Sequence, residues 1–262
     1  MAHDFAHLAL CQLRDYDRAF PGSIFSDPDF TLTLPEAYEL QFKVADMRER
    51  RGEAIAGYKI GCISKPVQEQ LGLNEPVIGH IFSSELHHSG ATLDVTSFDH
   101  LAIEGEFAFR ISEDVPDTDW LIANSERAIE SAFPVIELHN HVFRSDASMR
   151  AQELIANNGL QAGLVLASRQ IPLIGPGDLL AETITVVRNG QIMGSSNGSA
   201  LPGGPLATLV LLARKLDKAG KKLMRGHIVL AGSPLPLYPA QPGDRFEVHC
   251  RSLPRNSLNL LL

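Results

Sequence analysis

The chain has 262 residues, 44% of them hydrophobic and 21% charged, and its formal net charge is -8. This length and composition predict a globular protein with a large core, built as one substantial domain or as one domain with a small extension. The acidic balance argues against a nucleic-acid partner, because binding to a phosphate backbone calls for a basic patch.

Cysteine usage and the lack of targeting signals predict a cytoplasmic location. Cys11, Cys62 and Cys250 are far apart and show no C-x-x-C spacing, which is typical of reduced thiols and not of a disulfide framework or a zinc knuckle. The first twenty residues include acidic side chains and no long apolar core, so they do not resemble a signal peptide. Because no apolar run is long enough to span a bilayer, we expect no membrane partner.

The first third of the chain predicts mainly helices. An amphipathic pattern covers residues 3–20. A second helix begins after Thr33, which forms a capping-box pattern with Glu36, and it ends before Gly52. A short third helix is predicted within residues 64–72, between a serine that suits an N-cap and a glycine that suits a C-cap.

From about residue 76 the pattern changes to short strands separated by turn residues. The clearest local signal is Asn189-Gly190 between two apolar runs, which predicts a tight hairpin. Two helices interrupt the strands, one over residues 205–220 and another over residues 125–133. Because strands do not alternate regularly with helices, the predicted fold class is α+β and not a doubly wound sheet.

Two acidic residues interrupt an otherwise apolar strand over residues 101–110. Glu104 and Glu106 are two residues apart, so the alternation of side chains along a strand places both on one face. A third acid, Glu137, stands among apolar neighbours in residues 133–138. Desolvating an unpaired carboxylate is costly, and two like charges about 4 Å apart repel by roughly 4 kcal/mol at an effective dielectric of 20.

Charge alone leaves several ways to stabilise these acids. One acid could be protonated, an Arg or Lys could pair with them, or a divalent cation could hold all three. Oxygen ligands favour a hard ion, Mg2+ or also Mn2+ or Ca2+, over zinc. The alternative is that one face of these strands is wet and the acids are simply solvated. The apolar neighbours of Glu137 favour burial.

Six segments of the chain together resemble the fumarylacetoacetase superfamily, and within it the branch of 2-keto-4-pentenoate hydratases and 4-oxalocrotonate decarboxylases. They occur in the family's order between about residues 57 and 250 and cover most of the chain. The segments are GYKIGCISKPVQEQLGLNEPVIGHIF, IEGEFAF, FPVIELH, NGSALPGGPLATLVLLARKL, GHIVLAGS and PGDRFEVH. Each motif alone is weak, but their combination is specific.

The resemblance implies a mixed β-roll catalytic domain over residues 76–262 and a mostly helical N-terminal region over residues 1–75. It also implies a homo-oligomer with Mg2+ or Mn2+ as its cofactor. The family's active-site lysine falls on Lys59, in the K-x-G pattern. Its metal-binding carboxylates fall on Glu104, Glu106 and Glu137.

The implied function is that of a metal-dependent lyase whose partner is a small 2-hydroxy-2,4-dienoate or 2-oxo acid. A divalent ion that chelates the carboxylate and the 2-oxygen stabilises negative charge on that oxygen, and both hydration and decarboxylation need this stabilisation. We expect a hydratase, as in aromatic meta-cleavage catabolism, with a 4-oxalocrotonate-type decarboxylase as the alternative.

Further candidate residues accompany the metal site. Lys59 would donate a proton or hold substrate charge, although a lysine in a strand, taken alone, is more often a snorkelling residue. Gly232 and Ser233 follow an apolar strand, where an amide and a hydroxyl could bind the substrate carboxylate; an ordinary turn is the alternative. Glu85 is a further catalytic candidate, and Asn158 is a substrate-binding candidate.

Several positions depart from the family's pattern. Ser84 stands where the branch usually has an aspartate, Asn157 where an aspartate is common, and Leu160 where a small polar residue is expected. The acidic, Ser and Arg run expected after the third metal carboxylate is replaced by Asn140, His141 and Val142. These changes spare the metal carboxylates and alter the groups that handle water and protons. The residues that could compensate are Lys59, His139 and His141.

Three rival functions stay open. The pattern GSSNG, residues 194–198, matches a serine-hydrolase nucleophile elbow around Ser196, but it lacks the required strand, sharp turn and immediate helix. A C–C bond hydrolase of acylpyruvates would use the same metal site. A catalytically impaired homologue would bind a metal and a 2-oxo acid without turnover, and the changes at Ser84, Val142 and Leu160 motivate this reading.

Overall fold

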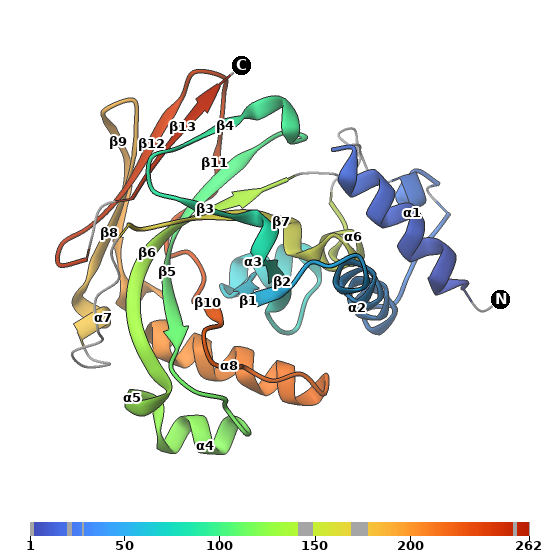
Figure 1. Cartoon of the computed structure of the whole chain (residues 1–262), viewed down its shortest axis with the longest axis horizontal. Coiled ribbons are helices and arrows are strands. Elements are labelled where there is room, and N and C mark those ends of the chain that lie inside the picture. Colours follow the sequence, from blue (N-terminus) through green and yellow to red (C-terminus); the bar gives the residue numbers. More distant parts are fainter. Residues whose placement is uncertain are drawn as a thin grey trace.

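The structure is a computed structural model that describes residues 3–19, 23–27, 29–140, 149–168, 178–253 and 256–261. Two β-sheets form its centre (Figure 1). The N-terminal helices α1 (Phe5–Asp17) and α2 (Leu34–Arg50) lie on one side of the molecule, and α8 (Gly204–Lys218) and α4 (Thr118–Ala123) lie on another (Figure 1). The predicted α+β class is confirmed.

The larger sheet contains eight strands of the described chain, in the order β2-β1-β10-β5-β6-β7-β3, with β11 paired to β5. The two longest strands, β5 and β6, form an antiparallel pair at its centre. Because β2 also contacts β7, the sheet curls into the expected roll. The strands are β1 (Ile55–Gly61), β2 (Val77–Phe82), β3 (Leu86–His88), β5 (Ala102–Ile111), β6 (Ile129–His139), β7 (Gln161–Leu166), β10 (Ile228–Leu230) and β11 (Tyr238–Pro239).

The smaller sheet has five described strands in the order β4-β13-β12-β8-β9. Its hairpin turns at Asn189 and Gly190, whose φ angles are 51° and 80°. Both residues tolerate this left-handed backbone, so the predicted hairpin is confirmed. The strands are β4 (Ala91–Asp94), β8 (Thr183–Arg188), β9 (Gln191–Asn197), β12 (Arg245–Cys250) and β13 (Asn256–Leu261).

The two sheets meet closely at Gly105, between the two acids of β5. A Cβ atom at this position would lie 2.8 Å from Val186 Cγ2 and 3.2 Å from Val248 Cγ2, both in the smaller sheet. Gly105 therefore faces the inter-sheet core, and the alternation of the strand turns Glu104 and Glu106 to the opposite face. A glycine at this point lets the second sheet approach while both acids face the inside of the roll.

The inside of the roll is apolar at one end. There Ala108 of β5 contacts a buried cluster that includes Phe133 and Val135 of β6. Ala108 is an even number of residues from the acids of β5, and Phe133 and Val135 are an even number from the acid of β6. All three therefore point to the same strand face as the acids. The carboxylates thus continue an apolar interior and do not lie on a wet outer face.

Side-chain caps define the start of the first two helices, and the second cap is the predicted one. The Asp4 side chain accepts hydrogen bonds from the backbone N–H groups of Ala6 and His7, both at 3.1 Å. Thr33 and Glu36 form the predicted capping box at the start of α2. The remaining helices are α3 (Lys65–Leu71), α5 (Ser125–Ala128), α6 (Ala151–Ala156) and α7 (Asp178–Ala181), with 3-10 turns η1 (Ser23–Phe25), η2 (Ser83–Glu85), η3 (Val95–Ser97), η4 (Asn158–Leu160) and η5 (Gly198–Ala200).

The prediction of a helix over residues 125–133 is wrong beyond Ala128. From Ile129 the chain is strand β6, which pairs with the whole length of β5. Ile129 and Phe133 are buried there. Sheet pairing and burial outweigh the local helical pattern of this segment.

The boundary predicted at residue 75 stays a prediction. The helices α1 and α2 precede it, but β1 also precedes it and pairs with β2 and β10 of the larger sheet. No helix among the described residues is long and apolar enough to cross a membrane.

Arg48 joins the N-terminal helices to the larger sheet. Its guanidinium is 2.5 Å from Glu53 Oε2 and 2.6 Å from Glu85 Oε1, and it lies over the Phe82 ring. The Tyr16 hydroxyl of α1 donates a hydrogen bond to Glu85 as well. Arg48, Ser84 and Arg51 hold the pKa of Glu53 at about 2, although burial acts to raise it.

Glu53→Gln is therefore expected to destabilise the protein in a pH-dependent way. At pH 7 the loss should be about 2 kcal/mol, because hydrogen bonds to a charged group are lost. The pKa of Glu53 is depressed in the folded state, so its contribution is complete above the unfolded-state value near 4.5 and disappears as the pH falls towards 2. Urea unfolding of both proteins between pH 7 and pH 3 measures the difference. Exposed Glu39→Gln is the control, and a difference independent of pH would contradict the assignment.

Candidate metal centre

The three acids predicted as metal ligands lie together inside the roll. Glu104 and Glu137 are direct register partners across β5 and β6. Glu106 lies two residues further along β5 and points to the same face. Glu137 is fully buried and Glu106 is 1% exposed, whereas the Glu104 side chain keeps 20% of its surface exposed. The strand pair thus brings three carboxyl groups together, two of them in the protein interior.

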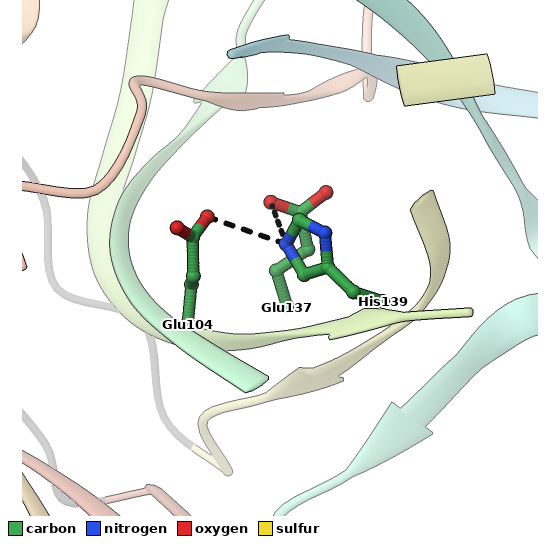
Figure 2. A group of neighbouring side chains, drawn as sticks. All are labelled: Glu104, Glu137 and His139. Atoms are coloured by element: carbon green, nitrogen blue, oxygen red, sulfur yellow. Dashed lines mark ion pairs between the residues drawn. The ribbon is translucent and has the colours of Figure 1, made fainter. Parts of the chain in front are cut away.

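Two basic side chains stand against these acids. Lys59 Nζ, from β1, is 3.2 Å from Glu137 Oε1. His139 Nε2, from the end of β6, is 3.2 Å from Glu104 Oε2 and 3.3 Å from Glu137 Oε2 (Figure 2). Each oxygen of Glu137 therefore faces a different basic group. Both basic side chains are buried.

The surroundings of the acids shift their pKa values in opposite directions. Burial raises the pKa of Glu106 well above its ordinary value, and the charges of Glu137 and Glu104 raise it further. Burial also acts to raise the pKa of Glu137, but Lys59 and His139 outweigh it and lower that pKa to about 2. Burial lowers the pKa of His139, yet the facing carboxylates raise it to about 9. Glu137 thus stays ionised at a pH at which Glu106 is already protonated.

The donor atoms of this cluster suit a divalent cation. One oxygen of Glu104, one oxygen of Glu137 and a ring nitrogen of His139 all lie within 4.8 Å of one another. Within the described part of the chain, neither oxygen of buried Glu137 accepts a hydrogen bond that meets normal geometry. Such oxygens, together with an imidazole nitrogen, are ligands that divalent ions accept. The residues present therefore fit the metal ion that the resemblance implies.

A cavity of about 450 Å³ opens onto the acids. At one end it is lined by polar groups, namely Lys59, Glu104, Glu106, His139, Gly232 and Ser233. Its other walls are mainly apolar and include Ile63, Val67, Leu71, Val77, Leu154, Leu160, Leu235 and Leu237. This arrangement suits a small molecule with a charged head and an apolar tail.

The candidates Gly232 and Ser233 line the cavity but have partners within the chain. The Gly232 N–H donates a 2.9 Å hydrogen bond to Glu106 Oε2. The Ser233 hydroxyl lies 3.1 Å from the Gly105 carbonyl and 2.9 Å from the Leu235 carbonyl, and it can donate to either. The loop thus fixes Glu106 in place. A direct role of these two residues in substrate binding remains a prediction.

Asn158 holds the turn that contacts Lys59. Its side chain accepts a 2.7 Å hydrogen bond from the His80 N–H and donates a 2.8 Å hydrogen bond to the His80 carbonyl. Asn158, Gly159 and Leu160 all have left-handed φ angles, between 57° and 64°. A Cβ atom at Gly159 would lie only 2.8 Å from Lys59 Cε. The amide of Asn158 is thus engaged with β2, and its role as a substrate ligand remains a prediction.

Glu85 lies apart from the metal carboxylates. Arg48 and Tyr16 bind its carboxylate at the junction of α1 and α2. The neighbouring Ser84 donates a 2.6 Å hydrogen bond to Glu53 Oε2 in the same network. The structure brings Lys59 and the three acids together and places Glu85 in a separate buried ion pair, so its catalytic role remains a prediction.

The other departures from the family pattern have structural partners. The Asn140 side chain accepts a 2.7 Å hydrogen bond from the Asp99 N–H. Asn157 donates a 2.9 Å hydrogen bond to the Glu153 carbonyl and accepts one from Gln12. Leu160 lines the cavity. His141 and Val142 lie outside the described residues.

The position of His139 beside the acids was not predicted from the sequence. From the sequence, His139 is predicted only as a substitute for missing proton-handling groups. The available signal was its spacing, because a residue two positions after Glu137 in a strand points to the same face. The rival nucleophile Ser196 lies on the hairpin strand β9, and the next α-helix begins only at Gly204, so the strand–turn–helix context of an elbow is absent around it.

Comparisons with known proteins agree on one family. The chain is 31% identical over 219 residues to 2-hydroxyhexa-2,4-dienoate hydratase from Comamonas testosteroni, covering 83% of this chain and 82% of that protein. It is 30% identical to 2-keto-4-pentenoate hydratase from Burkholderia vietnamiensis, with the same coverage of 83% and 82%. No family model matches the chain.

Solved structures show the same fold. 4-Oxalocrotonate decarboxylase from Pseudomonas putida G7, complexed with magnesium and adipate, superposes with a TM-score of 0.89 at 21% identity and covers 98% of this chain and 97% of that chain. Fumarylpyruvate hydrolase from Pseudomonas aeruginosa, in complex with Mn2+ and pyruvate, gives a TM-score of 0.60 at 17% identity, with coverage of 78% and 88%.

Gly159→Ala is expected to move Lys59 away from Glu137. The added methyl group needs the space that the lysine side chain fills, and alanine at this positive φ costs about 1 to 2 kcal/mol. Gly72→Ala is the matched control, because Gly72 has a φ of +66° and nothing within 4 Å of an added Cβ. Urea unfolding should show similar losses for both variants, and crystal structures should show displacement of Lys59 only in Gly159→Ala. An unchanged Lys59–Glu137 ion pair in that variant would contradict the prediction.

Proposed function

Because the chain belongs to the 2-keto-4-pentenoate hydratase family of the fumarylacetoacetase superfamily, we propose that it is a divalent-metal-dependent hydro-lyase that acts on a small 2-hydroxy-2,4-dienoate. One observation carries this proposal: buried carboxylates and a buried lysine meet at the polar end of an otherwise apolar cavity. The named hydratases that the chain resembles over more than four fifths of its length support the same reaction class.

The cofactor of this proposal is Mg2+ or Mn2+, held by the carboxylates of Glu104, Glu106 and Glu137. When bound, such an ion supplies a Lewis acid for the carboxylate and 2-oxygen of a 2-oxo acid. The chain itself supplies the orientation of the ligands, since the backbone N–H of Gly232 fixes one oxygen of Glu106. The solved neighbours that contain magnesium or Mn2+ support a divalent ion in this fold.

We assign Lys59 as the proton donor at the site. Its ammonium is buried in the cavity wall, and Glu137 with the other acids raises its pKa although burial acts to lower it. Lys59 Nζ therefore carries its proton in the resting site and can bind negative charge that develops on the substrate. An ion bound to the same acids would lower the pKa of Lys59 towards the range of a proton donor. The turn at Gly159 limits where this ammonium can lie.

The cavity favours a dienoate with an apolar tail over a dicarboxylate. The second carboxylate of 4-oxalocrotonate would need a cation far from the metal end. Among the described residues that line the cavity, the basic groups are Lys59 and His139, and both already face the acids. The remaining walls are mainly apolar, with Ser64 and Gln70 as polar exceptions, and suit the hydrocarbon part of a dienoate. Hydration is thus preferred to decarboxylation as the reaction. A cytoplasmic location and a homo-oligomeric state remain predictions from the sequence.

The direct test is turnover of defined substrates. We expect the protein to hydrate 2-hydroxypenta-2,4-dienoate, with loss of the dienoate absorbance, and to act poorly on 4-oxalocrotonate. EDTA should abolish the activity, and added Mg2+ or Mn2+ should restore it. Products are identified by mass spectrometry. Faster loss of CO2 from 4-oxalocrotonate would favour a decarboxylase, and turnover of neither substrate with intact metal binding would favour an impaired homologue.

Lys59→Met tests the proton donor. The substitution should lower kcat by about 10²- to 10⁴-fold, the range for loss of a positioned acid or base. Metal affinity should not fall, because the variant removes a cation that competes for Glu137. Exposed Lys218→Met is the control and should keep normal kinetics. A kcat close to that of the unaltered protein would contradict the assignment of Lys59.

A further inference from the structure

We propose that His139 is itself a ligand of the bound metal ion and that this nitrogen ligand makes the site prefer a first-row transition-metal dication such as Mn2+ over Mg2+. The inference rests on the proposed function, because it concerns the ion held by the same carboxylates. The inference adds a fourth protein ligand to the three acids. It also predicts which of Mg2+ and Mn2+ the site prefers, a choice that the three acids alone leave open.

The spacing of the donor atoms supports a shared ion. Two ligands at right angles around one metal, each about 2.1 Å from it, lie about 3.0 Å apart. His139 Nε2 is 3.2 Å from an oxygen of Glu104 and 3.3 Å from an oxygen of Glu137 (Figure 2). The nitrogen thus occupies the position of a neighbouring ligand to both oxygens. The three side chains come from two paired strands, which fixes them relative to one another.

A protonated His139 paired with both acids is the alternative that the same distances allow. This pairing is incompatible with a dication held by the same oxygens. Two unit charges about 4 Å apart repel by roughly 4 kcal/mol at an effective dielectric of 20, and a dication doubles that energy. An ion held by these oxygens would therefore repel an imidazolium, so the ion pair and the metal site are mutually exclusive arrangements of the same three side chains.

Sheet pairing fixes the place of His139 beside the acids. It is 5% exposed and lies at the end of β6, in register with Ala102 of β5 and Gln161 of β7. The backbone is thus held by strands on both sides. A neutral imidazole at this position would present the lone pair of Nε2 to an ion held by Glu104 and Glu137.

A nitrogen ligand changes which metal the site prefers. Mg2+ is a small, hard ion that is usually held by carboxylates, phosphates and waters. Imidazole is a softer ligand that suits Fe2+, Ni2+, Cu2+ and Zn2+ best. Mn2+ is the weakest binder of this first-row series, but it accepts imidazole more readily than the harder Mg2+ does. A site of three carboxylates and one imidazole should therefore select Mn2+, or a later transition-metal ion, when Mg2+ competes at equal concentration.

Pulsed EPR of the Mn2+-loaded full-length protein tests the ligation directly. The spectrum should show hyperfine coupling from one directly bound imidazole nitrogen. Incorporation of ¹⁵N-histidine should convert this signal to the ¹⁵N pattern, which separates it from any coupling to Lys59. The measurement needs no variant and no turnover. Mn2+ bound without a histidine coupling would overturn His139 ligation and leave the proposed hydratase intact.

The His139→Val variant tests the selectivity. Competition between Mn2+ and Mg2+, followed by the EPR signal of free Mn2+, should show the preference for Mn2+ falling by about tenfold or more, the scale of lost metal-site interactions. His100→Ala, at an exposed position, is the control and should keep both the coupling and the preference. An unchanged preference in His139→Val would overturn the selectivity. Failure of the unaltered protein to bind any divalent ion would contradict both this inference and the proposed function.

Discussion

The position of Glu104 directly opposite the buried Glu137 is the constraint on which the site depends. Two like charges at cross-strand distance destabilise a sheet, and a third acid on the same face adds to the repulsion. Lys59 and His139 offset this repulsion, because each lies within 3.3 Å of an acid oxygen. A bound dication would act on the same imbalance, because it would supply the positive charge that these carboxylates need.

The two-sheet architecture makes this arrangement possible. Gly105 lets the smaller sheet approach β5 from outside, so the flanking acids must face inwards. The interior they enter is already apolar, which keeps bulk water away from the charges. Low local polarity strengthens each charge interaction in the cavity and also makes an unpaired charge more costly there.

Local sequence signals correctly predicted the features that depend only on short segments of the chain. The capping box at Thr33, the turn at Asn189-Gly190 and the common face of Glu104 and Glu106 depend on neighbouring residues, and the structure contains all three. The extent of β6 could not be predicted in this way, because its first residues are strand only through pairing with β5. Contacts across the fold, such as Arg48 with Glu85, have no periodic signature and became visible only in three dimensions.

The N-terminal helices contribute to the site through a series of contacts that no motif reveals. The Gln41 amide of α2 donates hydrogen bonds to the carbonyls of Ile155 and Ile78, at 2.7 and 3.0 Å, and so ties α6 to β2. The turn that follows α6 is bound to β2 again through Asn158, and its glycine lies against Lys59. The lysine that faces the metal carboxylates is thus held in part by a helix that contributes no side chain to the metal cluster. Helix and roll therefore act as one support for the Lys59 ammonium, whichever residue is taken as the boundary between them.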